Sequence, residues 1–277
     1  MNGLASAFRE AGAAAWGGTD YERLLPAMSP ECRRRAALLC PEAAAVLVAA
    51  FPYWAGDRPG NLSLYARGKD YHRVVLRRLE TVCSYLRRKY PGELFLAGTD
   101  SSPLPEREAA RLAGVGIAGR NGLVILPPYG SWIFLGTILT TARLPVPERE
   151  PAPACRNCGR CAAVCPGGAL TGPGTPAERC LSHLTQKKGE LSPEEAALVA
   201  AHPYVWGCDL CQRVCPYNAG CALSPLPEFR EGLVDRLDAA DLAGLTNRSF
   251  RARFGARAFA WRGPGVLRRN LELQNGE

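Results

Sequence analysis

Hydrophobic positions follow two different periods along the first half of the chain. The uninterrupted apolar run 44–51 (AAVLVAAF), which ends at Pro52, predicts a buried strand. Over 70–90, apolar residues recur at helical spacing while arginines occupy the other faces, which predicts an amphipathic helix. A strand at 94–97 and a helix at 105–113, with proline in its first turn, are predicted next. We therefore expect an α+β fold, built on an α/β-type N-terminal domain.

One uncharged stretch, between Arg120 and Arg143, is long enough to cross a bilayer. Its centre, 127–131 (PPYGS), has turn chemistry that would break a spanning helix. Two buried strands, 123–126 and 132–140, joined by a turn explain the stretch better. Because the first residues also lack a basic segment followed by an apolar run, we expect no secretion signal, no membrane association and a cytoplasmic protein.

The pattern changes at a proline-rich segment, 145–153, which is typical of an extended connection. We predict three parts: a domain over 1–148, a cysteine-rich domain over 149–225, and a basic helical tail over 226–277. The formal net charge is +8, and only four of the 34 basic residues are lysine. This arginine excess can reflect a GC-rich genome, but the net charge still permits an anionic partner such as a nucleic acid.

Twelve cysteines are the main chemical signal, and eight of them fall within about sixty residues. The first run is C-x2-C-x2-C-x3-C-P and the second is C-x2-C-x3-C-P, spacings typical of proteins with two four-iron clusters, in which the last cysteine of a run serves the other cluster. We assign the ligands of cluster one to Cys155, Cys158, Cys161 and Cys215, and those of cluster two to Cys165, Cys180, Cys208 and Cys211.

Alternatives to this assignment remain open. Cys221 competes with Cys180 for the last place in cluster two. Zinc would need only four ligands, so eight cysteines at these spacings disfavour it. Cys32, Cys40 and Cys83 are expected to fill apolar space. Two such clusters carry electrons but leave no iron open to a substrate.

Several motifs together resemble those of epoxyqueuosine reductases. They are 206–218 (WGCDLCQRVCPYN), the upstream cysteine run, Asp100-Ser101-Ser102-Pro103 followed by Glu106 and Arg107, 65–72 (YARGKDYH) and 129–132 (YGSW). The similarity runs from about Phe51 to the end of the chain. Many members continue past the region 268–270 into a helical-repeat domain that helps to hold tRNA, so the chain resembles a short form.

The resemblance implies an oxidoreductase that depends on cobalamin and on two 4Fe-4S clusters, and that is related to reductive dehalogenases. The N-terminal domain would cradle the corrinoid beside a bacterial-type double-cluster ferredoxin domain. The implied reaction reduces the epoxide of epoxyqueuosine in a tRNA anticodon to the alkene of queuosine. The enzyme would be a monomer that takes electrons from an external low-potential donor.

Specific residues acquire roles from the same resemblance. Asp100 matches the proton donor, and a desolvated carboxyl at that place would suit an acid that opens an epoxide, although a turn aspartate is the alternative. Contacts to the corrinoid are implied for the set Ser63, Asp70, Tyr71, His72, Asp100 and Asp209. The glycine-rich segment 114–121 does not match a dinucleotide fingerprint, and we interpret it as backbone that approaches the corrinoid.

Phosphate contacts to tRNA are predicted for 186–189 (QKKG) and for the arginine-rich tail, with a solvated basic surface as the alternative. Two rival functions remain: a corrinoid iron–sulfur reductase of another epoxide or halide, and a two-cluster electron carrier without corrinoid.

Overall fold

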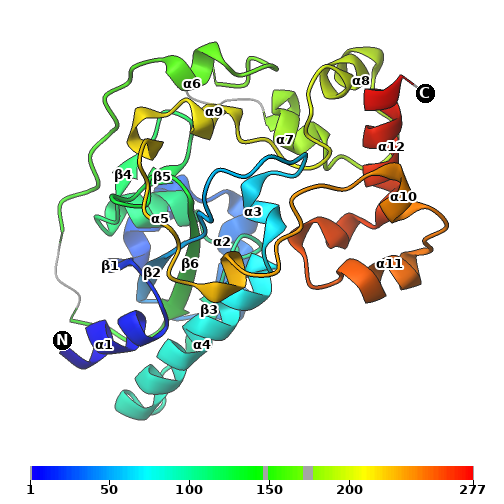
Figure 1. The fold of residues 1–277 in the computed structure, drawn as a ribbon. Coiled ribbons are helices and arrows are strands. Elements are labelled where there is room, and N and C mark those ends of the chain that lie inside the picture. The colour runs from blue at the N-terminus through cyan, green and yellow to red at the C-terminus, as the bar shows by residue number, and fades with distance from the viewer. Residues whose placement is uncertain (1, 146–148, 171–176, 277) are drawn as a thin grey trace. The chain divides into compact units, whose positions relative to one another are not determined.

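The computed structural model describes residues 2–145, 149–170 and 177–276, and it divides the chain into two compact units (Figure 1). Unit 1 comprises Met1–Pro52 and His72–Asn157, and unit 2 comprises Tyr53–Tyr71 and Cys158–Glu277. The segment 53–71 thus belongs with the C-terminal half of the chain. The predicted division of the chain into three domains, with boundaries at 148 and 225, remains a prediction.

Unit 1 is built on a four-stranded antiparallel sheet with the strand order β1-β2-β6-β3. Its strands are β1 (Ala15–Asp20), β2 (Ala45–Pro52), β3 (Phe95–Gly98) and β6 (Ile133–Thr140), and a separate pair is formed by β4 (Ile117–Ala118) and β5 (Val124–Ile125). The helices are α1 (Asn2–Glu10), the 3-10 helix η1 (Tyr21–Ala27), α2 (Pro30–Leu39), α4 (Tyr71–Lys89, whose first residue belongs to unit 2) and α5 (Glu106–Leu112).

Both faces of the central strand β2 are covered, and all eight of its residues are buried. Alternate residues Val46, Val48 and Ala50 share a core with α5 and η1. On the opposite face, a side chain at Gly136 of β6 would collide with Val75 and Leu79 of α4, so α4 lies directly on the sheet. Burial on both sides explains why the β2 segment is continuously apolar rather than alternating.

The predicted elements of this half are confirmed with small shifts of their ends. The strand expected at 44–51 is β2, the helix expected at 70–90 is α4, and the uncharged stretch forms β5 and β6 with a turn between them. In the part of the chain that the structure describes, no helix is long and apolar enough to cross a membrane. Part of the predicted connection, 146–148, lies outside the described residues.

Unit 2 consists of short helices and turns. Its elements are α3 (Leu64–Arg67), α6 (Arg160–Ala163), η2 (Ala177–Arg179), α7 (Leu181–Leu184), α8 (Pro193–Ala200), α9 (Leu210–Arg213), η3 (Pro216–Asn218), η4 (Pro227–Phe229), α10 (Ala239–Leu242), α11 (Asn247–Phe254), η5 (Ala258–Arg262) and α12 (Pro264–Asn275). Trp206 is fully buried in one core with Phe250, Phe259 and Leu267. The C-terminal tail therefore packs against Trp206, which lies two residues before the second cysteine run.

Candidate functional site

Asp100 lies in the turn that follows β3, and its backbone is held in a conformation unusual for a residue with a side chain. Its φ angle is +55°, in the left-handed region. The side chain is 63% exposed, and its Oδ2 lies 3.1 Å from Nε2 of His72 on α4. The structure therefore brings together two of the predicted site residues, which are 28 positions apart in the sequence.

Glu106, the first residue of α5, anchors this turn. Its Oε1 accepts a hydrogen bond of 2.7 Å from the backbone N–H of Asp100. Burial raises the pKa of Glu106 to about 7, and the Asp100 carboxylate raises it further, whereas the Asp100 N–H, His72 and the Ser102 hydroxyl lower it. The sequence placed Glu106 in a family motif but gave it no role. The signal that could have indicated this role is its position six residues after Asp100, at the start of a helix.

Ser63 and Asp209 form a second, fully buried pair within unit 2. The Ser63 hydroxyl donates a 2.5 Å hydrogen bond to Oδ1 of Asp209, and the Leu64 N–H donates one of 2.9 Å to Oδ2. Burial raises the pKa of Asp209, while these two donors and the charges of Arg213 and Arg67 lower it. The pair ties α3 to the start of α9, next to the predicted ligand Cys208.

Asp70 and Tyr71 stand where the chain passes from unit 2 to unit 1. The Asp70 N–H donates to the Ala256 carbonyl at 2.7 Å. The Tyr71 ring packs edge-on against Tyr65, with centroids 6.1 Å apart, and the Tyr65 hydroxyl accepts from Trp206 Nε1 at 2.8 Å. The six residues predicted to contact a corrinoid, Asp100 included, thus fall in both units, and their role as contacts remains a prediction.

The eight cysteines assigned to clusters are all free thiols. Cys155 belongs to unit 1 and the other seven to unit 2. Burial raises the pKa of Cys208 to about 12, and charge on Cys180 and Cys165 adds to the rise, so these three predicted cluster-two ligands lie close enough to interact. Cys221 interacts instead with Cys215, a predicted cluster-one ligand, which favours Cys180 over Cys221 as the fourth ligand of cluster two.

Backbone N–H groups point at several of these sulfur atoms, as expected for thiolates that hold iron–sulfur clusters. The Ala169 N–H donates to Cys165 Sγ at 3.2 Å, the Arg120 N–H donates to Cys155 Sγ at 3.3 Å, and the Leu210 backbone donates to Cys208. The donor set therefore fits the predicted clusters. Among the described residues, no group of three or more His, Cys, Asp or Glu side chains is arranged to hold a single metal ion.

Three other cysteines line the interior of unit 1, in agreement with their predicted packing role. Cys40 and Cys83 are buried, and Cys32 packs against the core that contains Cys40. Burial raises the pKa of Cys83 to about 12, so its thiol stays protonated at neutral pH.

The glycines of 114–121 are explained by protein neighbours. A side chain at Gly114 would meet the Glu150 carbonyl at 2.9 Å, and one at Gly116 would meet the Ile125 carbonyl at 2.7 Å. Both have positive φ angles, +65° and +78°. Their lack of a side chain thus makes room for the chain after Arg149 and for β5.

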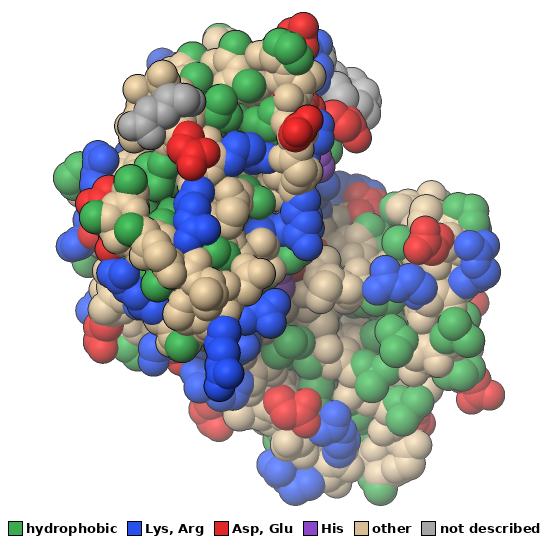
Figure 2. Space-filling view, turned by 90° about the vertical axis from the view of Figure 1, so that its right-hand side faces the viewer, with side chains coloured by type: hydrophobic (Ala, Val, Ile, Leu, Met, Phe, Trp, Pro, Cys, Tyr) green, Lys and Arg blue, Asp and Glu red, His purple; other side chains and the backbone are tan. Residues whose placement is uncertain are grey.

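Most of the arginine-rich tail is engaged inside unit 2. Among the described residues, five tail arginines donate to backbone carbonyl oxygens: Arg230 to Ser224, Arg253 to Asp241, Arg257 to Arg67 and Gly232, Arg268 to Leu242 and Leu245, and Arg269 to Leu184, Lys187 and Gly189. Arg262 lies over the Trp261 ring. In the predicted 186–189 segment, Lys187 pairs with Glu195, which leaves Lys188, Arg248 and Arg251 as exposed candidates for phosphate contact. Figure 2 looks onto the side that carries α8, α11 and α12, where Lys and Arg side chains are spread over the surface.

Comparison with known proteins now defines the class. A family model described as "4Fe-4S double cluster binding domain" matches residues 154–218, and one described as "Epoxyqueuosine reductase QueG, DUF1730" matches residues 33–101. The chain is thus an α+β iron–sulfur protein with a double-cluster domain. The second model covers both β2 and the Asp100 turn.

Curated relatives and solved structures identify the family. The epoxyqueuosine reductase of Lactococcus garvieae is 35% identical over 80% of this chain, which spans 65% of that relative's length. The epoxyqueuosine reductase of Synechococcus sp. (strain RCC307) is 32% identical over 96% of this chain and 84% of its own length. A crystal structure of an epoxyqueuosine reductase with an epoxyqueuosine-modified tyrosine tRNA stem loop is similar at a TM-score of 0.85 and 28% identity, covering 99% of this chain and 80% of that one. This chain belongs to the epoxyqueuosine reductase family.

Proposed function

We propose that this protein reduces epoxyqueuosine in a tRNA anticodon to queuosine, with two 4Fe-4S clusters and cobalamin as cofactors. Membership of the family supports the reaction, and the relative that was crystallised with a modified tRNA stem loop supports the substrate. The single observation in this chain that carries the proposal is the Asp100 carboxylate, which follows β3, is 63% exposed and pairs with His72. We further propose that the protein works in the cytoplasm as a monomer.

The reaction consumes two electrons and two protons, and it converts the epoxide to an alkene and water. A bound corrinoid would supply the low-valent metal that delivers the electrons. Asp100 would hold a proton on its carboxyl and give it to the epoxide oxygen as the carbon–oxygen bond breaks. His72, 3.1 Å from Oδ2, is placed to return a proton to Asp100.

The cysteines would carry electrons through two clusters. Cluster one would be held by Cys155, Cys158, Cys161 and Cys215, and cluster two by Cys165, Cys180, Cys208 and Cys211. Our proposed contacts to the corrinoid are Ser63, Asp70, Tyr71, His72, Asp100 and Asp209. For the buried Ser63–Asp209 pair, the geometry favours a supporting role in which the pair fixes the backbone of α3.

The test uses the chain after anaerobic reconstitution with iron, sulfide and cobalamin. A stem loop that contains epoxyqueuosine is incubated with the enzyme and dithionite, and the nucleosides are analysed by mass spectrometry. We expect queuosine from the unaltered chain and a rate at least about 100-fold lower from Asp100→Asn, because general acids contribute roughly 10²–10⁴-fold. Asp20→Asn, at an exposed carboxylate at the end of β1, is the matched control and should keep its rate.

Two results would count against the proposal. Unchanged conversion by Asp100→Asn would remove Asp100 as the acid. A chain that holds about eight irons but retains no cobalt after desalting would favour the electron carrier without corrinoid.

A further inference from the structure

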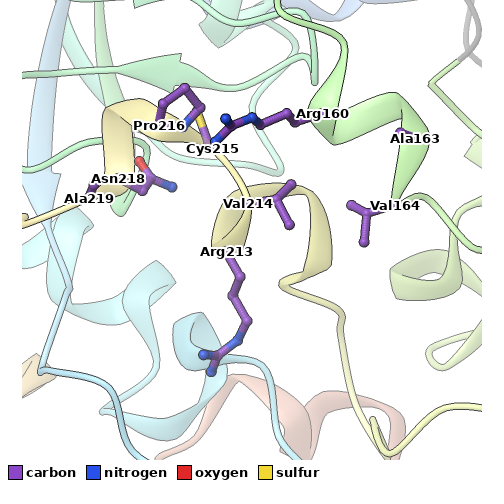
Figure 3. Close-up of a pocket in the computed structure, with 9 residues that line it drawn as sticks. All are labelled: Arg160, Ala163, Val164, Arg213, Val214, Cys215, Pro216, Asn218 and Ala219. Atoms are coloured by element: carbon purple, nitrogen blue, oxygen red, sulfur yellow. The ribbon is translucent and has the colours of Figure 1, made fainter.

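A surface groove lies between the two cysteine runs of unit 2 (Figure 3). Its volume is about 590 Å³, and it is lined by residues from α6 and the turn after it and from the end of α9 to the residues after η3. Ala163, Val164, Val214 and Pro216 make its floor apolar. The Cys215 side chain lines one end.

The local duplication of the cysteine runs explains this groove. Each run continues as a helix, a valine, a cysteine and a proline: α6 leads to 164–166 and α9 leads to 214–216. The two helices pack side by side, so the two valines lie on facing segments. The groove is therefore a consequence of the double-cluster motif.

The charge around the groove has one sign. Arg160 and Arg213 line it, and none of the lining residues is acidic. Arg213 is partly neutralised, because it pairs with Asp57 at 2.8 Å and also donates to the Tyr204 hydroxyl. Arg160 is exposed and pairs with no acidic side chain among the described residues, and Figure 3 shows it extending from α6 toward Cys215.

The groove also lies beside a predicted ligand of cluster one. Cys215, which lines it, and the exposed Cys158 are both assigned to cluster one. An electron that enters from another protein must come close to a cluster, and a partner bound in this groove would lie next to Cys215, a predicted ligand of cluster one.

We propose that this groove is the docking site of an acidic one-electron carrier protein, which delivers electrons to cluster one. An apolar floor with a charged rim is the usual anatomy of a protein interface, and weak electron-transfer complexes need little area. A basic rim selects an acidic partner and steers its approach. The inference rests on the proposed function for the use of the electrons, but the docking step itself does not depend on tRNA.

The electron balance is simple. In each encounter the reduced carrier loses one electron and cluster one gains it. Two encounters supply the two electrons that, with two protons, reduce the epoxide to an alkene and water.

The test measures docking without turnover. Reduced flavodoxin, an acidic one-electron carrier, is mixed anaerobically with the reconstituted chain, and the loss of cluster absorbance is followed by stopped flow. We expect Arg160→Glu to slow the reduction about tenfold at low ionic strength, with the difference shrinking as salt screens the charge. Arg236→Glu, an exposed arginine outside the groove, carries the same charge change and should keep the unaltered rate.

Reduction by dithionite separates docking from damage to the cluster. Arg160→Glu should be reduced by dithionite as fast as the unaltered chain, because a small reductant needs no docking surface. If Arg160→Glu fails to bind iron, Ala163→Glu places a negative charge on the same groove without removing a side chain that extends toward Cys215. It should show the same selective slowing.

Three outcomes would overturn the inference: equal flavodoxin rates for Arg160→Glu and the unaltered chain, equal slowing by Arg236→Glu, or weaker stem-loop binding by Arg160→Glu with an unchanged flavodoxin rate. The last would assign the groove to nucleic acid. If the flavodoxin result holds but dithionite-driven conversion of epoxyqueuosine fails, the docking site stands and the proposed substrate does not.

Discussion

Glu106 gives the Asp100 turn a pH-dependent anchor. Its pKa is raised from the ordinary value of 4.5 to about 7, chiefly by burial. If the turn opens and water reaches the carboxyl, the ordinary value returns. The closed turn is therefore favoured by protonation of Glu106: this stability is fully present below pH 4.5 and is lost as the pH rises through 7. One pKa unit corresponds to roughly 1.4 kcal/mol. After allowance for solvent screening, protonation of Glu106 favours the closed turn by about 1–3 kcal/mol.

We predict that the Asp100 turn opens more readily above pH 7 than below it, and that Glu106→Gln abolishes this dependence. The neutral glutamine keeps an oxygen for the Asp100 N–H but cannot ionise. Hydrogen exchange of a peptide covering 97–105, at pH 6 and pH 8 and corrected for intrinsic exchange, measures the opening. Glu108→Gln, on the same helix and paired with Arg111, is the control and should behave as the unaltered chain. A pH dependence that persists in Glu106→Gln would contradict the prediction.

At the scale of elements, Gly207 fixes the approach of α3 to the second cysteine run. Its φ angle is +73°, and a side chain there would lie 2.4 Å from Cβ of Ser63. Ser63 cannot easily move away from such a side chain, because it is fully buried and hydrogen-bonded to Asp209. The N–H of Gly207 is also bonded to the Thr185 hydroxyl at 2.9 Å. Any substitution therefore strains the backbone and displaces the residue before Cys208.

We expect Gly207→Ala to lower the free energy of unfolding by more than about 2 kcal/mol and to lose iron from cluster two, because strain and a steric clash add. Gly189→Ala is the matched control: Gly189 has a φ angle of +78° but no atom within 4 Å of the added carbon, so only strain of about 1 kcal/mol is expected. Iron content per chain and anaerobic thermal unfolding are the measurements. Equal losses for the two variants would show that the contact with Ser63 is unimportant.

Sequence patterns predicted those elements whose signal is local. The β2 strand and the α4 helix followed from an apolar run and a helical period, whereas the cluster ligands, assigned from cysteine spacing, remain a prediction. The strand β1 (AWGGTD) was not predicted, because its two glycines break the strand pattern. One of them, Gly17, makes room for the Ala113 carbonyl. The His72–Asp100 pair depends on how α4 lies on the sheet, and no local pattern contains that information.

At the scale of the whole molecule, the net charge of +8 overstates the basic surface available to tRNA. Among the described residues, five tail arginines donate hydrogen bonds to carbonyl oxygens of unit 2, and Arg269 donates to the carbonyls of both Lys187 and Gly189. These guanidinium groups help to stabilise the short helices of unit 2. Arginines whose guanidinium groups are bonded to carbonyl oxygens are less available to neutralise phosphate.

We predict that Arg248 and Arg251, both exposed on α11, contribute to tRNA affinity while Arg269 contributes to stability. Each neutralised phosphate adds roughly 0.7–0.9 to the slope of log affinity against log salt, so replacing both Arg248 and Arg251 by alanine should lower that slope by about 1–2. The measurement is fluorescence anisotropy of a labelled stem loop over a range of salt concentrations. Arg269→Ala should leave the slope unchanged and lower the melting temperature, because carbonyls of the Leu184–Gly189 region lose their donor. A double variant with an unaltered slope would mean that α11 does not face the phosphates, and the exposed Lys188 would then be the next residue to replace.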